Sequence, residues 1–142
     1  MSKTAVIYWS STGNTEAMAN AVLDGAKSVN ADTAMFTVSD ISAADAAAYD
    51  TLILGCPAMG SEQLEEGEFE PFFTDLEGSL AGKNVALFGS YGWGDGEWMR
   101  NWAERVTAAG AKLVGEGLTV NDAPDADAVA ACEELGKTAA AL

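Results

Sequence analysis

Three short apolar runs constrain the fold of this chain more than any other feature of its sequence. They cover residues 3–9, 51–55 and 83–90, and none of them alternates strictly between apolar and polar side chains. Strands of a parallel sheet that helices cover on both faces have this pattern, because both of their faces are buried. The runs therefore predict the centre of a parallel sheet between two layers of helices.

The rest of the chain supplies the other elements of such a sheet. Two weaker strands are expected at residues 33–38 and 112–120, and Gly115 and Gly117 indicate a bulge or a sheet edge in the second. Apolar residues recur at helical spacing in four stretches, at residues 14–28, 69–80, 97–109 and 125–142. Five strands separated by helices predict a three-layer α/β fold, with residues 1–142 forming a single domain.

Three polar and glycine-rich loops follow three of the predicted strands. They lie at residues 10–15, 56–68 and 90–97. Ligands of an open parallel sheet bind at the carboxyl ends of its strands, where the winding of the chain reverses. We therefore expect these three loops to form one binding site.

The first loop has the composition of a phosphate-binding loop. Its residues are Ser10, Ser11, Thr12, Gly13, Asn14 and Thr15. Hydroxyls, an amide and the free N–H groups of a helix N-terminus can together hold a phosphate. The loop lacks the lysine of a Walker A loop and the glycine pattern of a dinucleotide fold, so we expect a phosphate that stays bound and is not transferred. A Ser/Thr-rich helix cap is an equally good interpretation of this loop taken alone.

The third loop carries an aromatic side chain with little local cover. Trp93 lies between Gly92 and Gly94, so we expect its indole either to face a ligand ring or to lie on the surface over a small apolar cluster. Met59, on the second loop, offers a polarizable contact for the other face of the same ring. Trp98 and Trp102 have helical spacing, and we assign both to the core.

Four segments carry a family resemblance. They are YWSSTGNTE (8–16), CPAMGSE (56–62), EPFFTDL (70–76) and FGSYGWGDGEW (88–98). In this order they resemble short-chain flavodoxins, especially the clostridial type, from residue 3 to about residue 139. The resemblance implies a flavodoxin-like fold with a five-stranded parallel sheet in the order 2-1-3-4-5 and helices on both faces. It also implies FMN as a non-covalently bound cofactor.

The resemblance implies a role for each part of the site. Ser10, Thr12, Asn14 and Thr15 would hold the phosphate, Ser90 and Asn121 would lie near the ribityl chain or ring edge, and Met59 and Trp93 would sandwich the ring. Glu62 would accept from N3–H of the flavin, and the Gly60–Ser61 peptide would turn its carbonyl toward N5–H after one-electron reduction. The expected cofactor-binding residues are Ser10, Ser11, Thr12, Gly13, Asn14, Thr15, Pro57, Ala58, Met59, Gly60, Ser61, Glu62, Ser90, Tyr91, Gly92, Trp93, Gly94 and Asn121.

The net charge of −15, from 22 acidic and 7 basic residues, narrows the possible partners. So acidic a chain repels nucleic acid and anionic membranes and attracts basic protein surfaces, although the charge alone is explained equally well by solubility. With no histidine and only Cys56 and Cys132, we expect no metal site and two cysteines that act as small apolar core residues. No targeting segment is recognisable, so we expect a cytoplasmic protein. We also expect it to be a monomer.

The resemblance implies a low-potential, one-electron carrier that is not an enzyme and that shuttles electrons between redox enzymes through semiquinone and hydroquinone states of FMN, and the acidic composition agrees with it. An anionic hydroquinone would be disfavoured by nearby carboxylates. The carboxylates expected there belong to Glu62, Glu65, Glu66, Asp95, Glu97 and Asp122. An FMN-dependent reductase of the same fold is the alternative, and an interaction module without FMN is also compatible. A phospho-signalling receiver is excluded, because Ser10–Ser11 and Cys56–Pro57 occupy the places of its aspartates.

Overall fold

The computed structural model describes residues 3–11, 13–59, 62–92 and 94–142. These residues form one sheet, with strands β1 (Thr4–Tyr8), β2 (Ala34–Thr37), β3 (Thr51–Gly55), β4 (Asn84–Tyr91), β5 (Lys112–Leu113) and β6 (Leu118–Asn121). The strands lie in the order β2-β1-β3-β4-β5, and β6 pairs with the second half of β4. Every pairing is parallel, which confirms the predicted sheet and its order.

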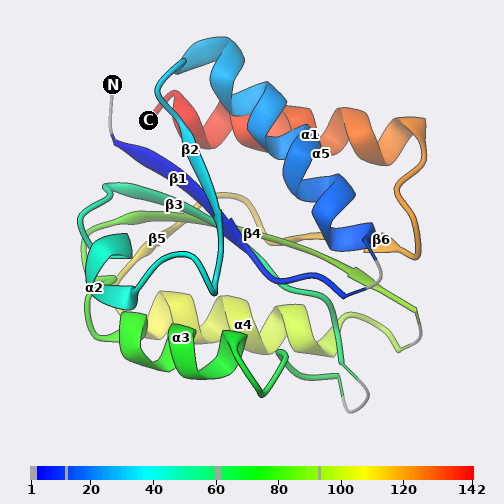
Figure 1. Cartoon of the computed structure of the whole chain (residues 1–142). Helices are drawn as coiled ribbons and strands as arrows, with labels where there is room; N and C mark the ends of the chain where they lie inside the picture. Colours follow the sequence, from blue (N-terminus) through cyan, green and yellow to red (C-terminus); the bar gives the residue numbers. More distant parts are fainter. Residues whose placement is uncertain (1–2, 12, 60–61, 93) are drawn as a thin grey trace.

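Helices cover both faces of this sheet. In the described ranges they are α1 (Asn14–Val29), α2 (Ala43–Ala46), α3 (Phe69–Glu77), α4 (Glu97–Ala108) and α5 (Ala126–Ala140). Figure 1 shows α1 and α5 side by side on one face and α3 and α4 on the other. The predicted three-layer arrangement is therefore confirmed. None of the helices in the described ranges has the length and apolar content that a membrane span requires.

The apolar runs of the sequence are buried because alternate residues enter different layers. Along β1, Ala5 and Ile7 pack in the core beneath α3 and α4, whereas Val6 and Tyr8 pack against α1 and α5. β3 and β4 divide their side chains between the same two cores. A central strand with two buried faces favours apolar side chains at successive positions, which explains the absence of polar alternation. Among the polar residues of these strands, Thr4, Thr51 and Ser90 are buried as well.

Two glycines bring α1 and α5 into close contact. A Cβ atom on Gly136 would overlap the carbonyl oxygen of Val22, and one on Gly25 would overlap the carbonyl of Glu133. Each glycine therefore lies directly against the backbone of the opposite helix. This contact holds the first and the last helix of the chain together above the sheet (Figure 1).

The fifth predicted strand, residues 112–120, is present as two short strands. β5 and β6 are separated at Gly115 and Gly117, whose φ angles of 76° and 92° fall in the left-handed region. Such angles interrupt an extended strand, so the predicted bulge is a complete break. The structure also contains α2, which the sequence did not predict because four residues are too few to show a helical period.

Both buried tryptophans and both cysteines lie where the sequence placed them. Trp98 and Trp102 are each 1% exposed, and Cys56 and Cys132 are fully buried free thiols. Burial raises the pKa of the Cys132 thiol to about 11 and raises that of Cys56 further, so both remain protonated at neutral pH. The prediction that all four belong to the core is confirmed.

Candidate functional site

A cleft of about 300 Å³ opens at the carboxyl ends of β1, β3 and β4. β2 and β3 lie on opposite sides of β1, so the winding of the chain reverses between β1 and β3, which is the switch point where this sheet type binds ligands. The cleft is lined by Ser11, Asn14, Pro57, Ala58, Met59, Ser90, Tyr91, Gly92 and Asp122. All three predicted loops contribute to it, and the last residue follows β6.

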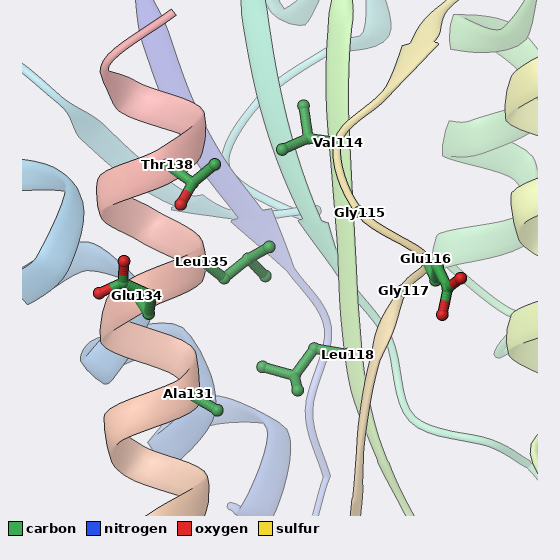
Figure 2. A pocket seen from close by; sticks show the side chains of 9 residues that line it. All are labelled: Val114, Gly115, Glu116, Gly117, Leu118, Ala131, Glu134, Leu135 and Thr138. Carbon is green, nitrogen blue, oxygen red and sulfur yellow. The ribbon is translucent and has the colours of Figure 1, made fainter.

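A second, larger hollow of about 520 Å³ lies between α5 and the connection from β5 to β6. Figure 2 shows Val114, Leu118 and Leu135 pointing into it from its two sides. Its lining contains no aromatic residue and none of the predicted site residues. Predicted binding residues therefore line the cleft between the loops and not this second hollow.

The first loop turns directly into α1. Gly13, at the helix N-cap, has a φ of 96°, a left-handed conformation that glycine adopts without strain. The hydroxyl oxygen of Ser10 accepts hydrogen bonds from the backbone N–H groups of Gly13, at 3.3 Å, and of Glu16, at 3.2 Å. Ser10 therefore caps this helix, while Ser11 and Asn14 line the cleft. The helix-cap interpretation thus applies to Ser10, and phosphate binding by Ser11 and Asn14 stays a prediction.

Buried hydroxyls tie the first loop to the end of β4. The Thr15 hydroxyl oxygen accepts from the backbone N–H of Ser90 at 3.4 Å, and both residues are buried. The Ser90 hydroxyl in turn donates to the carbonyl oxygen of Asp122 at 2.7 Å. The loops after β1, β4 and β6 are thus joined below the cleft, and Thr15 is not part of its lining.

The second loop is held to β4 and to α4. The N–H of Ala58 donates to the carbonyl of Ser90 at 3.0 Å, which continues the pairing of β3 with β4. Oε1 of Glu62 accepts from the backbone N–H groups of Gly96, at 3.1 Å, and Glu97, at 3.2 Å, at the start of α4. A Cβ atom on Gly94 would come within 2.5 Å of this carboxylate, so glycine leaves room for it there. Glu62 therefore joins the second loop to the third.

Asp122 is a cleft residue that the predicted binding set lacks. Its φ of 57° is left-handed, a conformation that aspartate tolerates better than most residues, and it turns the chain into the cleft after β6. Its neighbour Asn121, which was predicted, is exposed, and its amide donates to the carbonyl of Tyr91 at 3.4 Å. The sequence signal for Asp122 was its place just after the last predicted strand, at the end where ligands of a parallel sheet bind.

Four predicted residues, Thr12, Gly60, Ser61 and Trp93, lie outside the described residues. Their roles remain predictions from the sequence.

Asp122 is the one acidic residue among the described residues that line the cleft. None of these lining residues is a lysine or an arginine, and Arg100, at the start of α4, pairs with Asp95 at 3.1 Å on the surface. Elsewhere in the described ranges, no group of histidine, cysteine, aspartate or glutamate side chains could hold a metal ion. The site therefore offers neutral hydrogen-bond donors to an anion, without a paired cation.

Glu65, one of the expected carboxylates, has a structural contact of its own. Its side chain accepts from the backbone N–H groups of Gly67, Glu68 and Phe69, at 2.5, 2.7 and 2.9 Å, where α3 begins. Partial burial raises the pKa of this carboxyl, but the three hydrogen bonds outweigh burial and hold the pKa below its usual value. Glu65 thus caps α3, a role that the sequence analysis did not identify.

A three-layer parallel α/β fold with a hydroxyl-rich loop and an apolar loop at the switch point defines a class of proteins that bind phosphorylated aromatic cofactors. The family model described as Flavodoxin matches residues 6–136 of this chain. The chain is 50% identical to a flavodoxin of Megasphaera elsdenii over 95% of its length and 96% of the relative's. It is 48% identical to a flavodoxin of Clostridium beijerinckii, covering 93% and 95% of the two chains.

A solved structure agrees with the sequence matches. The solution structure of two-electron reduced Megasphaera elsdenii flavodoxin superposes with a TM-score of 0.87 at 48% identity, over 98% of this chain and 99% of that one. The chain belongs to the flavodoxin family. It binds FMN and is an electron-transfer protein rather than an enzyme, so the predicted class is confirmed and the alternative of a reductase is not supported.

Proposed function

We propose that FMN lies in the cleft with its phosphate at the N-terminus of α1 and its ring between the loops that follow β3 and β4. The observation that carries this proposal is the composition of the cleft wall. Ser11 and Asn14 at one end are polar and lie at a helix N-terminus, whereas Pro57, Ala58 and Met59 at the other are apolar. A ligand with a phosphate at one end and a flat ring at the other matches this division.

The phosphate end depends on the N–H groups at the start of α1. The Ser10 hydroxyl oxygen already accepts from two of these N–H groups, those of Gly13 and Glu16, so it caps the start of the helix. Asn14 and Ser11 face the cleft and can donate to phosphate oxygens, and Thr12 is predicted to do the same. The partial positive charge of a helix N-terminus stabilises an anion without a lysine or arginine.

The ring end combines an apolar floor with one carboxylate. Met59 and Tyr91 line the cleft, and Trp93 is predicted to cover the opposite face of the ring. Since Glu62 accepts from Gly96 and Glu97 through Oε1, its Oε2 can accept from a ring N–H. The Gly60–Ser61 peptide lies between Met59 and Glu62 in the sequence, so it is the predicted hydrogen-bond partner for the ring edge.

FMN, when bound, supplies the one-electron chemistry. This chain supplies an acidic environment, with a net charge of −15 and the Glu62 and Asp122 carboxylates at or beside the cleft. Like charges disfavour each added negative charge, so they lower the potential at which the last electron is accepted. The protein is therefore suited to give electrons at low potential.

The net negative charge also indicates the kind of protein on which the carrier docks. We propose that it acts as a monomeric, single-domain protein in the cytoplasm and docks transiently on basic surfaces of redox proteins. Exposed acidic residues of the loops that follow β3 and β4, Glu66 and Asp95 among them, would face such a partner. Attraction between opposite charges speeds encounter without requiring a tight complex, which suits a carrier that must leave after each transfer.

The binding of FMN and of riboflavin by single variants tests the placement of the phosphate. Asn14→Ala should weaken FMN binding by about 1.5–3 kcal/mol, the usual value for a hydrogen bond to a charged group, and leave riboflavin binding unchanged. Asn20→Ala is the matched control, because Asn20 is exposed on the same helix. Equal losses for FMN and riboflavin in Asn14→Ala would refute the phosphate site.

A further inference from the structure

We propose that Trp98 is a positioning residue for the cofactor: it holds the base of the loop formed by residues 57–64, the segment between β3 and the start of α3. This inference rests on the proposed function, because that loop is the one we place against the flavin ring. Trp98 belongs to α4, and its side chain lines no part of the cleft. Its effect on the cofactor would therefore act through the loop.

The contact that carries the proposal is a buried hydrogen bond. The indole Nε1–H of Trp98 donates to the carbonyl oxygen of Cys56 at 3.1 Å. Cys56 directly follows β3 and precedes Pro57, and it is fully buried. A buried carbonyl without a donor costs free energy, so this indole fixes the point at which the chain leaves the sheet and enters the loop.

The neighbouring strand leaves room for this bond. A Cβ atom on Gly89 of β4 would overlap the Cys56 carbonyl oxygen and would lie 3.2 Å from Cζ2 of Trp98. Only a residue without a side chain lets the carbonyl and the indole meet there. Gly89 of β4 thus leaves room for the Cys56 carbonyl oxygen, and Trp98 of α4 donates a hydrogen bond to the same oxygen.

The residue that follows the loop, Glu65, also contacts Cys56. The backbone N–H of Glu65 lies 3.4 Å from the Cys56 sulfur, which accepts its hydrogen bond. Glu65 then caps α3 through its carboxylate. Cys56 therefore holds the two ends of loop 57–64 together, its carbonyl bound to Trp98 and its thiol to Glu65.

The fixed position of Cys56 sets where the inner residues of the loop lie relative to the cofactor. Met59 lines the cleft and Glu62 bonds α4, and both positions depend on where the chain leaves Cys56. The predicted rotation of the Gly60–Ser61 peptide requires flanking residues that stay in place while it turns. Without the Trp98 bond, the whole segment would shift with the peptide, and the cofactor would lose its ordered contacts in both redox states.

α4 offers a matched pair of variants for the test. Trp102 lies one turn after Trp98, is equally buried, and its Nε1 has no hydrogen-bond partner among the described residues. Trp98→Phe and Trp102→Phe remove the same atoms from the same helix, but only the first removes a hydrogen bond. Trp98→Phe should lose more global stability in urea unfolding than Trp102→Phe, because it alone leaves a buried carbonyl oxygen without a donor.

The primary readout is amide hydrogen exchange in the FMN-free protein. In Trp98→Phe, the amides of Ala58 and Glu65 should exchange about tenfold faster relative to amides of α1 and α5, as expected when a buried hydrogen bond is lost. FMN and riboflavin should both bind about tenfold more weakly, because the ring contacts are shared by the two ligands. The separation between the first and second one-electron potentials of bound FMN should narrow. None of these changes is expected in Trp102→Phe.

Equal exchange, affinity and potentials in the two variants would refute the role of Trp98. If Trp98→Phe does not fold, β-(3-benzothienyl)alanine at positions 98 and 102 replaces the indole N–H by sulfur and preserves the bicyclic ring, and the same comparison applies. Met59→Ala in the otherwise unchanged protein tests the proposed function separately. Unchanged flavin binding in that variant would refute the ring site itself, whereas weakened binding there together with equal tryptophan variants would refute only the positioning role.

Discussion

The carboxylate of Glu62 accepts a hydrogen bond from the backbone N–H of Gly96 at 3.1 Å, across 34 residues of sequence. The bond joins the loop after β3 to the first turn of α4. A carboxylate at a helix N-terminus satisfies N–H groups that have no partner within the helix and interacts favourably with the helix dipole. Glu62 therefore has a role in the fold in addition to the one proposed for it at the flavin.

Two substitutions separate these roles of Glu62. Glu62→Gln keeps an oxygen for the N–H groups of Gly96 and Glu97 but replaces the other oxygen by an amide donor, so FMN binding should weaken by about 1.5–3 kcal/mol with little change in the stability of the FMN-free protein. Glu62→Ala should weaken binding and also lower the free energy of unfolding by about 1 kcal/mol, because the cap is lost. Titration calorimetry and urea unfolding measure the two effects. FMN affinity that is unchanged in Glu62→Gln would contradict the proposed contact.

The contact between α1 and α5 predicts the sign of a glycine substitution. Alanine usually stabilises a helix interior by about 1 kcal/mol over glycine, but a Cβ on Gly136 would overlap the Val22 carbonyl. Gly136→Ala should therefore lower the free energy of unfolding by about 1–3 kcal/mol, the range found for overpacked cores. Gly78→Ala is the control, since nothing lies within 4 Å of a Cβ there. A stabilised Gly136→Ala variant would mean that the helices separate easily.

The capping carboxylate of Glu65 predicts a pH dependence. Its pKa in the folded protein lies below the ordinary value of 4.5, so its stabilising effect is complete above pH 4.5 and is lost as the pH falls through the folded pKa. Glu65→Gln should be less stable than the parent by about 1–2 kcal/mol at neutral pH, and this difference should shrink in acid. Urea unfolding of both proteins between pH 3 and 7 measures it.

A control is needed because protonation also relieves repulsion within so acidic a protein. The difference between parent and variant removes that common effect. Glu104, which is exposed near the middle of α4, provides a Glu104→Gln variant whose stability should follow the parent at every pH. A Glu65→Gln difference that stays constant into acid would show that the ionised carboxylate does not cap α3.

Electron exchange with a basic partner should slow as salt is added. Charges on the surface are screened over about 10 Å at 0.1 M ionic strength, so the attraction that steers encounter weakens. Replacing Glu66 and Asp95 by Gln and Asn should lower the rate at low salt by a factor of a few and flatten its salt dependence. Stopped-flow kinetics measures both. Asp24→Asn with Asp32→Asn changes the net charge equally, and a loss as large in this control would place the docking surface elsewhere.

The sequence predicted the centre of the fold better than its edge. Apart from Thr51, residues 51–55 are apolar, and both faces of β3 are covered, so pattern and structure agree. The last predicted strand, 112–120, is broken because Gly115 and Gly117 take left-handed angles, which residue type permits but does not require. α2 left no periodic signal in its four residues.

At the site, the sequence identified which loops meet but not every contact within them. Ser11, Asn14 and Met59 line the cleft as residue type and position suggested. Glu65 looked like one surface acid among many, and its bonds to three N–H groups depend on how the chain turns into α3. Ser10 and Thr15 bond backbone groups that only the folded loops bring near. Pairings of this kind depend on three-dimensional approach, which a linear pattern of residue types does not contain.

The close contact between α1 and α5 has a consequence for how the chain folds while the ribosome synthesises it. Every described residue that lines the cleft precedes α5, so a ribosome has made all of them before the last helix emerges. Until then the buried residues of α1, Met18 and Val22 among them, have no cover on that side. A nascent chain therefore carries its binding residues while the apolar surface of α1 that α5 covers is still exposed, and synthesis of the fifteen residues of α5 provides that cover.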